Sequence, residues 1–212
     1  MWALALPGLV DRPKGLAARP ADAARSASAQ LLQEWDLVHR AQQCEEAAQT
    51  SLYQVYYPKV YNYAHLQLGE VQAAEDLASD VMVKVLESLK DYQFRGTPFA
   101  AWVFRIARNR LIDLHRRRQR RGEVALSETL PSRDAGPPSL AERAMSRDEL
   151  RAALARLTEE QRQVVALKFI EGFDNRSVAK VIGRSEGAVK SLQHRALLSL
   201  RRILTEERAR GG

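Results

Sequence analysis

The residues best suited to bind another molecule lie between Phe94 and Arg121, where aromatic side chains precede a run of arginines. If this stretch is helical, one side of it carries four polar groups: Arg105, Arg108, Asn109 and Arg116. Guanidinium groups bind phosphates, and amide groups read the edges of bases. Because eight arginines from Arg105 to Arg121 are opposed only by Asp113, the pattern predicts a nucleic-acid surface. A charged helix face that merely contacts water is the alternative.

Aromatic residues crowd the start of the same stretch: Phe94, Phe99, Trp102 and Phe104. Aromatic rings beside basic groups hold unpaired bases by stacking. We expect Phe99 to favour the protein core over this role. Trp102 lies at the border between the apolar and polar faces, and it fits either role.

A helix beginning at about Phe99 would position these groups. Thr97 is a good N-cap, and Pro98 suits the first helical position, where its missing N–H is not needed. Six residues then share the inward face: Phe99, Val103, Ile106, Ala107, Leu111 and Leu114. Arg110 projects toward this apolar face, and we expect it to pair with Asp113 or to extend past the core.

Composition narrows the class of protein. The chain has 212 residues, 45% of them hydrophobic, a net charge of +7 and a pI of about 9.8, which favours a polyanionic partner such as nucleic acid or an anionic membrane. A single cysteine, Cys44, excludes an internal disulfide and a cysteine-cluster zinc site. No apolar run approaches the roughly 20 residues that span a bilayer, and Pro7 and Asp11 interrupt the weakly signal-like start, so we expect a cytoplasmic protein without membrane insertion.

The sequence contains no recognisable metal-binding or catalytic motif. None of the four histidines has a partner at metal-ligand spacing. There is no nucleophile–base pair, no phosphate-binding glycine loop and no pair of catalytic carboxylates. The sequence therefore predicts a binding protein that is not an enzyme and that uses no metal or cofactor.

The periodicity predicts an all-α fold of two small helical domains joined by a flexible linker. Residues 1–28 form a disordered or weakly ordered extension, residues 29–121 the first domain, 122–139 the linker and 140–206 the second domain. In the first domain the helical pattern begins at about Ser28, is kinked or restarted at Pro58, and pauses near Gly69.

The stretch Glu70–Asp91 predicts a helix with two distinct faces. Its inward face carries Ala74, Leu77, Ala78, Val81, Val85 and Leu89. Its opposite face carries what we call the acidic row: Asp76, Asp80, Val83 and Glu87. An acidic surface with an apolar residue on it is typical of a docking site for a basic partner helix, and a solvated acidic face is the alternative.

The second domain predicts a helix-turn-helix. Capping boxes at Ser139 and Thr158 start helices at about Leu140 and Glu159. Further along, Asp174 caps a short helix, Gly183 breaks it and Ser185 caps the next. That last helix turns five residues inward: Val189, Leu192, Ala196, Leu200 and Ile203.

The outward residues of this last helix suit a DNA major groove, with some facing bases and some facing phosphates. They and their flanking residues are Arg184, Ser185, Glu186, Gly187, Lys190, Ser191, His194, Arg195 and Arg202. A small residue such as Gly187 lets the backbone approach DNA closely. A helical hairpin with a charged face is the alternative.

These motifs together resemble a known family, the extracytoplasmic-function (ECF, group 4) sigma factors of the sigma-70 family. Ala74-Glu-Asp-Leu77 and the acidic helix, followed by Phe94-Arg-Gly96 and Arg105-Ile-Ala-Arg-Asn109, resemble region 2. Leu157-Thr-Glu-Glu-Gln161 and Glu186-Gly-Ala-Val-Lys-Ser191 resemble region 4. The resemblance covers about residues 45–205.

The resemblance implies a subunit that binds core RNA polymerase and directs promoter recognition and opening. The acidic row would dock on the clamp helices of the β′ subunit, and region 4 would bind the β flap. The loop Phe94–Pro98 would capture a flipped base of the −10 element, with Arg105 and Asn109 reading its upstream part. The −10 contacts as a set are Phe94, Arg95, Gly96, Thr97, Phe99, Trp102, Arg105, Asn109 and Arg116.

Region 4 would enter the major groove of the −35 element, and the linker would thread toward the active-site and RNA-exit channels of the polymerase. Many family members are held inactive by an anti-sigma factor, which makes such a protein a candidate partner. Two rival hypotheses remain at this point. One is an autonomous helix-turn-helix regulator that binds duplex DNA alone, and the other is an adaptor that uses both charged faces for proteins.

Overall fold

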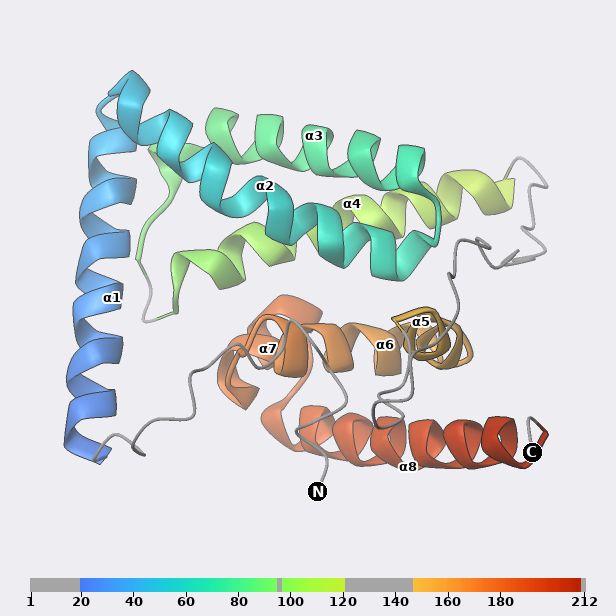
Figure 1. Ribbon diagram of the computed structural model, residues 1–212. Helices are drawn as coiled ribbons and strands as arrows, with labels where there is room; N and C mark the ends of the chain where they lie inside the picture. Colours follow the sequence, from blue (N-terminus) through green and yellow to red (C-terminus); the bar gives the residue numbers. More distant parts are fainter. Residues whose placement is uncertain (1–19, 95–96, 121–146, 211–212) are drawn as a thin grey trace, which may run out of the picture.

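The computed structural model describes residues 20–94, 97–120 and 147–210. These residues form helices joined by short loops and contain no strand, which confirms the all-α prediction (Figure 1). The N-terminal half comprises α1 (Pro20–Gln42), α2 (Glu46–Leu68), α3 (Val71–Glu87), the 3-10 helix η1 (Leu89–Asp91) and α4 (Phe99–Arg120). The C-terminal half comprises α5 (Arg147–Ala155), α6 (Glu159–Val165), the π-turn η2 (Ala166–Ile170), α7 (Asn175–Ile182) and α8 (Glu186–Arg210).

Several helix boundaries agree with the sequence. The helix α4 begins at Phe99, as predicted. Gly69 ends α2 in the left-handed conformation, with φ of 76°, and donates its N–H to the carbonyl of His65. Thr158 forms the predicted capping box with Gln161. The capping box predicted at Ser139 lies outside the described residues.

Two helical segments differ from the prediction. The helix α1 already begins at Pro20, before the expected start at Ser28. Proline is well tolerated in a first helical turn and alanine favours helix, but these small residues carry no apolar periodicity from which the start could be read. In addition, Pro58 lies inside the single helix α2, so of the two predicted outcomes, a kink or a restart, the restart does not occur. Proline removes one backbone hydrogen bond there, while Tyr56 and Val60 on either side of it are buried in the core.

The N-terminal half is a bundle in which α2, α3 and α4 lie side by side and α1 crosses their ends (Figure 1). All six residues predicted on the inward face of α3 and η1 are buried. On α4, Phe99, Val103, Ala107 and Leu111 are buried, while Ile106 and Leu114 pack at the edge of the core.

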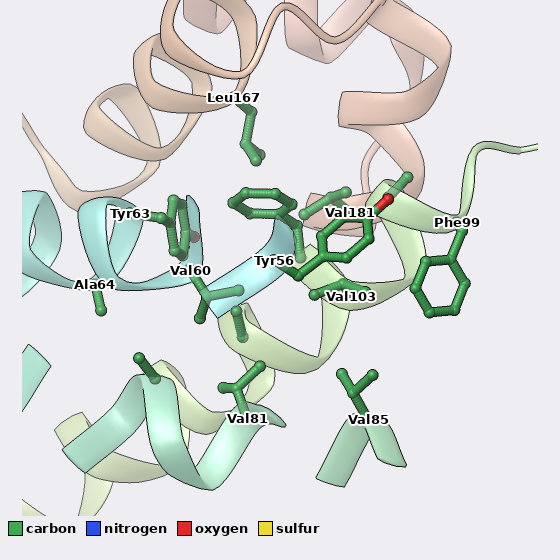
Figure 2. Packing of buried hydrophobic residues seen from close by; sticks show 14 of the residues in the cluster. Tyr56, Val60, Tyr63, Ala64, Val81, Val85, Phe99, Val103, Leu167 and Val181 are labelled. Carbon is green, nitrogen blue, oxygen red and sulfur yellow. The ribbon is translucent and has the colours of Figure 1, made fainter. Parts of the chain in front are cut away.

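The two halves share one hydrophobic core, which the sequence did not predict. Leu167 and Val181 of the C-terminal half belong to the same buried cluster as Tyr56, Val60 and Val103 of the N-terminal half (Figure 2). The ring of Phe104 meets the ring of Phe173 edge-on, with centroids 5.3 Å apart. The contact is made mainly by α7 against α4, with α5 and α6 touching α2.

Side-chain hydrogen bonds also join the two halves. The Arg108 Nε donates to the Gln163 Oε1 at 3.1 Å, and the Arg162 Nε donates to the Gln67 Oε1 at 3.1 Å. Arg108, predicted on the outer face of α4, therefore faces the C-terminal half instead. Glu171 of the C-terminal half also interacts with Lys59 of α2. Burial raises the pKa of the Glu171 carboxyl to about 7, and the positive charge of Lys59 opposes that rise.

The carboxylate of Glu34 ties three helices of the N-terminal half together. It lies on α1, accepts a hydrogen bond from the Tyr56 hydroxyl of α2, and accepts the Phe99 N–H at the start of α4 at 3.2 Å. The first N–H groups of a helix have no partner within the helix, so a carboxylate there is stabilising. Burial, together with this carboxylate, raises the pKa of Tyr56.

Replacing this carboxylate should therefore destabilise the fold. We expect Glu34→Ala to lower the free energy of unfolding by about 2 kcal/mol, because it leaves a hydroxyl and a helix N–H without their acceptor. Urea denaturation followed by circular dichroism measures this. Asp36→Ala on the same helix removes only an exposed ion pair with Arg40 at 3.8 Å, and should cost less than about 0.5 kcal/mol. Equal losses for both variants would contradict the assignment.

Candidate nucleic-acid interface

The acidic row lies on the exposed side of α3. Asp76, Asp80, Val83 and Glu87 are all exposed, and Val83 has 57% of its surface accessible. Gln72 donates to the Asp76 carboxylate at 3.0 Å, and Lys84 pairs with Glu87 at 3.4 Å. An exposed valine between carboxylates gives this surface both an apolar contact point and a negative charge.

A groove of about 180 Å³ separates α3 from α4 and explains the position of Arg110. Asp76 and Asp80 line the groove from α3, while Arg110 and Arg117 line it from α4. Arg110 thus reaches past the apolar face toward the acids of the neighbouring helix. The basic end of α4 is further held by Arg118, which pairs with Glu70 at 3.0 Å.

The basic face of α4 presents Arg105, Asn109 and Arg116 to solvent. Of the aromatic residues before it, Phe94 is 53% exposed and meets Trp35 of α1 edge-on, with ring centroids 5.9 Å apart. Trp102 is partly buried against Tyr92, at 5.0 Å between centroids. Arg95 and Gly96 lie outside the described residues.

Phe99 is a core residue, so its inclusion among the base contacts was wrong. It is only 2% exposed and is enclosed by the rings of Tyr56, Tyr92 and Trp102. Thr97 is partly buried, and its hydroxyl accepts a hydrogen bond from Lys180 of α7. Trp35 is an exposed aromatic beside Phe94 that the sequence did not single out, because residues of α1 are distant in the chain.

The helix-turn-helix forms as predicted. Asp174 accepts the Ser177 N–H at 2.8 Å. Hydrogen bonding with the Ser177 side chain, and to a lesser degree with this N–H, holds the pKa of the Asp174 carboxyl below its usual range. Gly183 ends α7 in the left-handed conformation with φ of 67°. Ser185 caps α8 by accepting the Ala188 N–H at 3.2 Å. The capping residues therefore fix the angle at which α8 leaves the turn.

The helix α8 has a buried face and an exposed face, although Leu197 and Leu198 are also exposed. The five residues predicted inward are buried, and each residue predicted to contact DNA is exposed. Arg184 pairs with Glu160 of α6 at 2.6 Å, an exposed ion pair that sequence spacing could not reveal. Such pairs contribute little and break readily, which leaves Arg184 available for a phosphate.

Within the described part of the chain, no group of three or more histidine, cysteine or acidic residues could hold a metal ion. Among the same residues, no helix has the length and apolar character needed to cross a membrane.

Two separate family models match the two halves of the chain. Residues 52–121 match the family model of sigma-70 region 2, and residues 147–200 match that of sigma-70 region 4. The two halves are therefore those of a sigma-70-type factor. The ECF RNA polymerase sigma factor BldN of Streptomyces coelicolor is 34% identical over 187 residues, covering 87% of this chain and 70% of BldN. SigX of Bacillus subtilis, another such factor, is 33% identical over 165 residues, covering 74% of this chain and 84% of SigX.

Solved structures agree with this relationship. CnrH, in complex with the cytosolic domain of CnrY, has a TM-score of 0.61 and 25% identity, covering 82% of this chain and 97% of CnrH. The sigma factor RpoE of Bartonella quintana, in complex with the anti-sigma factor NepR, shares the fold with a TM-score of 0.62 at 24% identity, covering 74% and 96%. The chain belongs to the ECF RNA polymerase sigma factors.

Two glycines of the helix-turn-helix should respond to alanine in opposite ways. Gly183 has a positive φ, so Gly183→Ala should cost about 1 kcal/mol of stability although its methyl group meets no atom within 4 Å. Gly187 is helical and its Cβ would meet only the Ser185 Oγ at 3.9 Å, so Gly187→Ala should gain about 0.5 kcal/mol. Urea denaturation of both variants checks the signs, and stabilisation by Gly183→Ala would contradict the turn geometry.

Proposed function

We propose that this sigma factor binds core RNA polymerase through the acidic row and directs it to promoters that both halves read. The observation that carries the proposal is that an exposed acidic row and two exposed faces rich in basic and polar side chains occur in the order of regions 2 and 4. We assign core-polymerase and −10 binding to residues 29–121 and −35 binding to residues 140–206. Residues 122–139 would connect the two domains.

The N-terminal half would read the −10 element as single strands. Arg105 and Asn109 offer donors to base edges, and Arg116 offers a charge to a phosphate. Phe94 and Trp102 offer ring surfaces, and the loop of Arg95, Gly96 and Thr97 would enclose a flipped base. Stacking and pocket contacts of this kind offset the few kcal/mol that unpairing a base costs.

The C-terminal half would read the −35 element as duplex. The N-terminal residues of α8, from Ser185 to Ser191, would face bases in the major groove, with Arg195 one turn further along. Lys190, Arg202 and Arg184 would contact phosphates, and His194 lies on the same exposed side. The positive end of the α8 dipole supports binding of the negatively charged backbone.

The factor itself would contribute binding and no catalysis, metal or cofactor, because the polymerase performs the chemistry. It would act in the cytoplasm, where polymerase and chromosome meet. On the polymerase its partners would be the β′ clamp helices and the β flap. An anti-sigma factor is a further candidate partner, and the complex of CnrH with the cytosolic domain of CnrY supports the binding of a second protein to a factor of this fold.

The decisive test is transcription in vitro with purified core polymerase, this protein and a library of randomised promoters. Selective initiation from a two-block −35 and −10 consensus is expected. Tight binding of the free protein to duplex DNA, with no binding to core polymerase, would instead support the autonomous regulator.

Reversing a charge in the acidic row should abolish docking. We expect Asp80→Arg to weaken binding to core polymerase at least tenfold, because it places a like charge against a basic partner surface. Glu75→Arg is the matched control, since Glu75 is exposed on α3 but lies off the row. Holoenzyme assembly on a sizing column, with circular dichroism as a check on folding, measures both. Normal assembly of Asp80→Arg would refute the role of the row.

Removing one amide of α4 should relax promoter choice. We expect Asn109→Ala to reduce discrimination among −10 sequences by about 1–3 kcal/mol at the base it reads, with core binding unchanged. Gln119→Ala on the same helix is the control, because Gln119 is an exposed amide without an assigned contact. A series of −10 mutant promoters transcribed by each variant gives the comparison. Intact discrimination by Asn109→Ala would exclude the contact.

A further inference from the structure

The segment between α3 and α4 is held against α1 at both of its ends (Figure 1). At the first end, the Gln42 Nε2 of α1 donates to the carbonyl of Leu89 at 2.9 Å and to that of Tyr92 at 2.8 Å. At the second end, the Glu34 carboxylate of α1 accepts the Phe99 N–H at 3.2 Å. Glu34 and Gln42 lie about two turns apart, so one side of α1 carries both anchors.

Between these two anchors, α1 carries two exposed aromatic side chains. Trp35 and His39 lie one turn apart, and their rings are nearly parallel, with centroids 6.3 Å apart and an interplanar angle of 22°. Phe94, which follows the anchored Tyr92, meets the Trp35 ring edge-on. All three side chains are exposed, Trp35 to 43% and Phe94 to 53%. We call Trp35, His39 and Phe94 the aromatic platform.

The exposure of these rings sets them apart from the aromatic residues that follow. Phe99, a few positions further along the chain, is enclosed by other rings and is only 2% exposed. Rings left in water forgo the free energy that burial would provide. Adjoining exposed apolar groups of this kind are typical of a binding site. The aromatic platform is therefore held in place by its anchors but is left uncovered.

The carboxylates beside the aromatic platform are occupied by other groups of the protein. Glu34 accepts hydrogen bonds from α2 and from the start of α4. Asp36 forms an ion pair with Arg40 at 3.8 Å, and Arg40 also pairs with Glu45. These pairings reduce the repulsion that the acidic residues of α1 would exert on a phosphate backbone. A nucleic-acid strand can therefore approach the rings.

We propose that Trp35, supported by His39 and Phe94, stacks on an unpaired base of the promoter strand. The assignment rests on the proposed function, and it adds a wall on α1 to the single-strand site that α4 would form. Stacking uses the π face that every base has, so the aromatic platform contributes affinity for opened DNA and little choice among bases. Its role thus differs from that of Asn109, whose amide would read a base edge.

A protein docked on α1 is the other occupant to test. Leu31 and Leu32, about one turn before Trp35, are 46% and 68% exposed, and aliphatic side chains contact proteins but do not stack on bases. It is the Trp35 ring that meets Phe94 in the segment leading to α4. This contact favours a base as the occupant, because it places the ring beside the residues that would bind the −10 strand. Variants of Trp35 and Leu32 separate the two occupants.

Binding of forked promoter DNA by the assembled holoenzyme is the direct measurement. The DNA carries a duplex −35 element and a single-stranded −10 strand, both from a promoter selected in the transcription test above. We expect Trp35→Ala to weaken binding roughly five- to a hundredfold, the loss typical of removing one ring from a stacked base. Trp35→Phe, which keeps a ring, should lose less than about fivefold, whereas Trp35→Leu should be as weak as Trp35→Ala.

Two results of this measurement would overturn the proposal. One is equal affinity of Trp35→Ala and the parent, which would show that the ring contributes nothing. The other is full affinity of Trp35→Leu, which would show that apolar packing suffices and that no base stacks there.

A matched control addresses the protein occupant. Leu32→Ala removes an exposed apolar side chain from the same helix outside the aromatic platform, and it should bind the forked DNA as the parent does. Trp35→Ala should assemble normally with core polymerase on a sizing column, with circular dichroism as a check on folding. Weakened assembly of Trp35→Ala would show that polymerase occupies this face of α1, and it would overturn the assignment to a base.

An abasic scan of the −10 strand locates the stacked base. Each base is removed in turn, and binding is measured for the parent and for Trp35→Ala. At one position the parent should lose affinity while Trp35→Ala loses none, because the variant has already lost that contact; at the other positions both should lose equally. Equal losses at every position would overturn the proposal. Failure of the parent to bind any forked DNA would count against the proposed function, and the stacking assignment would fall with it.

Discussion

One helix, α4, has to serve three surfaces at once, and the arrangement of the molecule depends on this constraint. With 3.6 residues per turn a helix offers about three separable faces. Val103, Ala107 and Leu111 face the N-terminal bundle, Phe104 and Arg108 face the C-terminal half, and Arg105 and Asn109 face solvent. Residues only one position apart therefore have different partners, so α4 cannot rotate without disturbing all three surfaces.

The start of α4 is fixed by contacts from outside the helix. Glu34 of α1 accepts its first N–H, while rings of Tyr56 and Tyr92 enclose Phe99. The loop before it contacts Lys180. Thr97 therefore lies between the fixed start of α4 and a contact from the C-terminal half.

The exposed face of α3 is acidic and that of α4 is basic, but some of these opposite charges line the same groove. Asp76 and Asp80 share a groove with Arg110 and Arg117. Neighbouring opposite charges lower the cost of placing several like charges on one helix. A partner that docks on the acidic row therefore meets a mixed edge along this groove, and its own charges must match carboxylates on one side and guanidinium groups on the other. Such a pattern selects a partner more narrowly than a uniformly acidic face would.

The sequence by itself determined the helices, their inward faces and the family. The stripes of α3 and α8, the caps at Thr158, Asp174 and Ser185, and the turn at Gly183 depend on residues only a few positions apart, so they can be read from spacing. Only the tertiary structure decided what depends on distant residues. It turned Arg108 away from solvent, brought Arg110 to the acids of α3, and set Glu34 at the start of α4. It also joined the two halves in one core, because packing between surfaces far apart in the chain leaves no periodic signal in either of them.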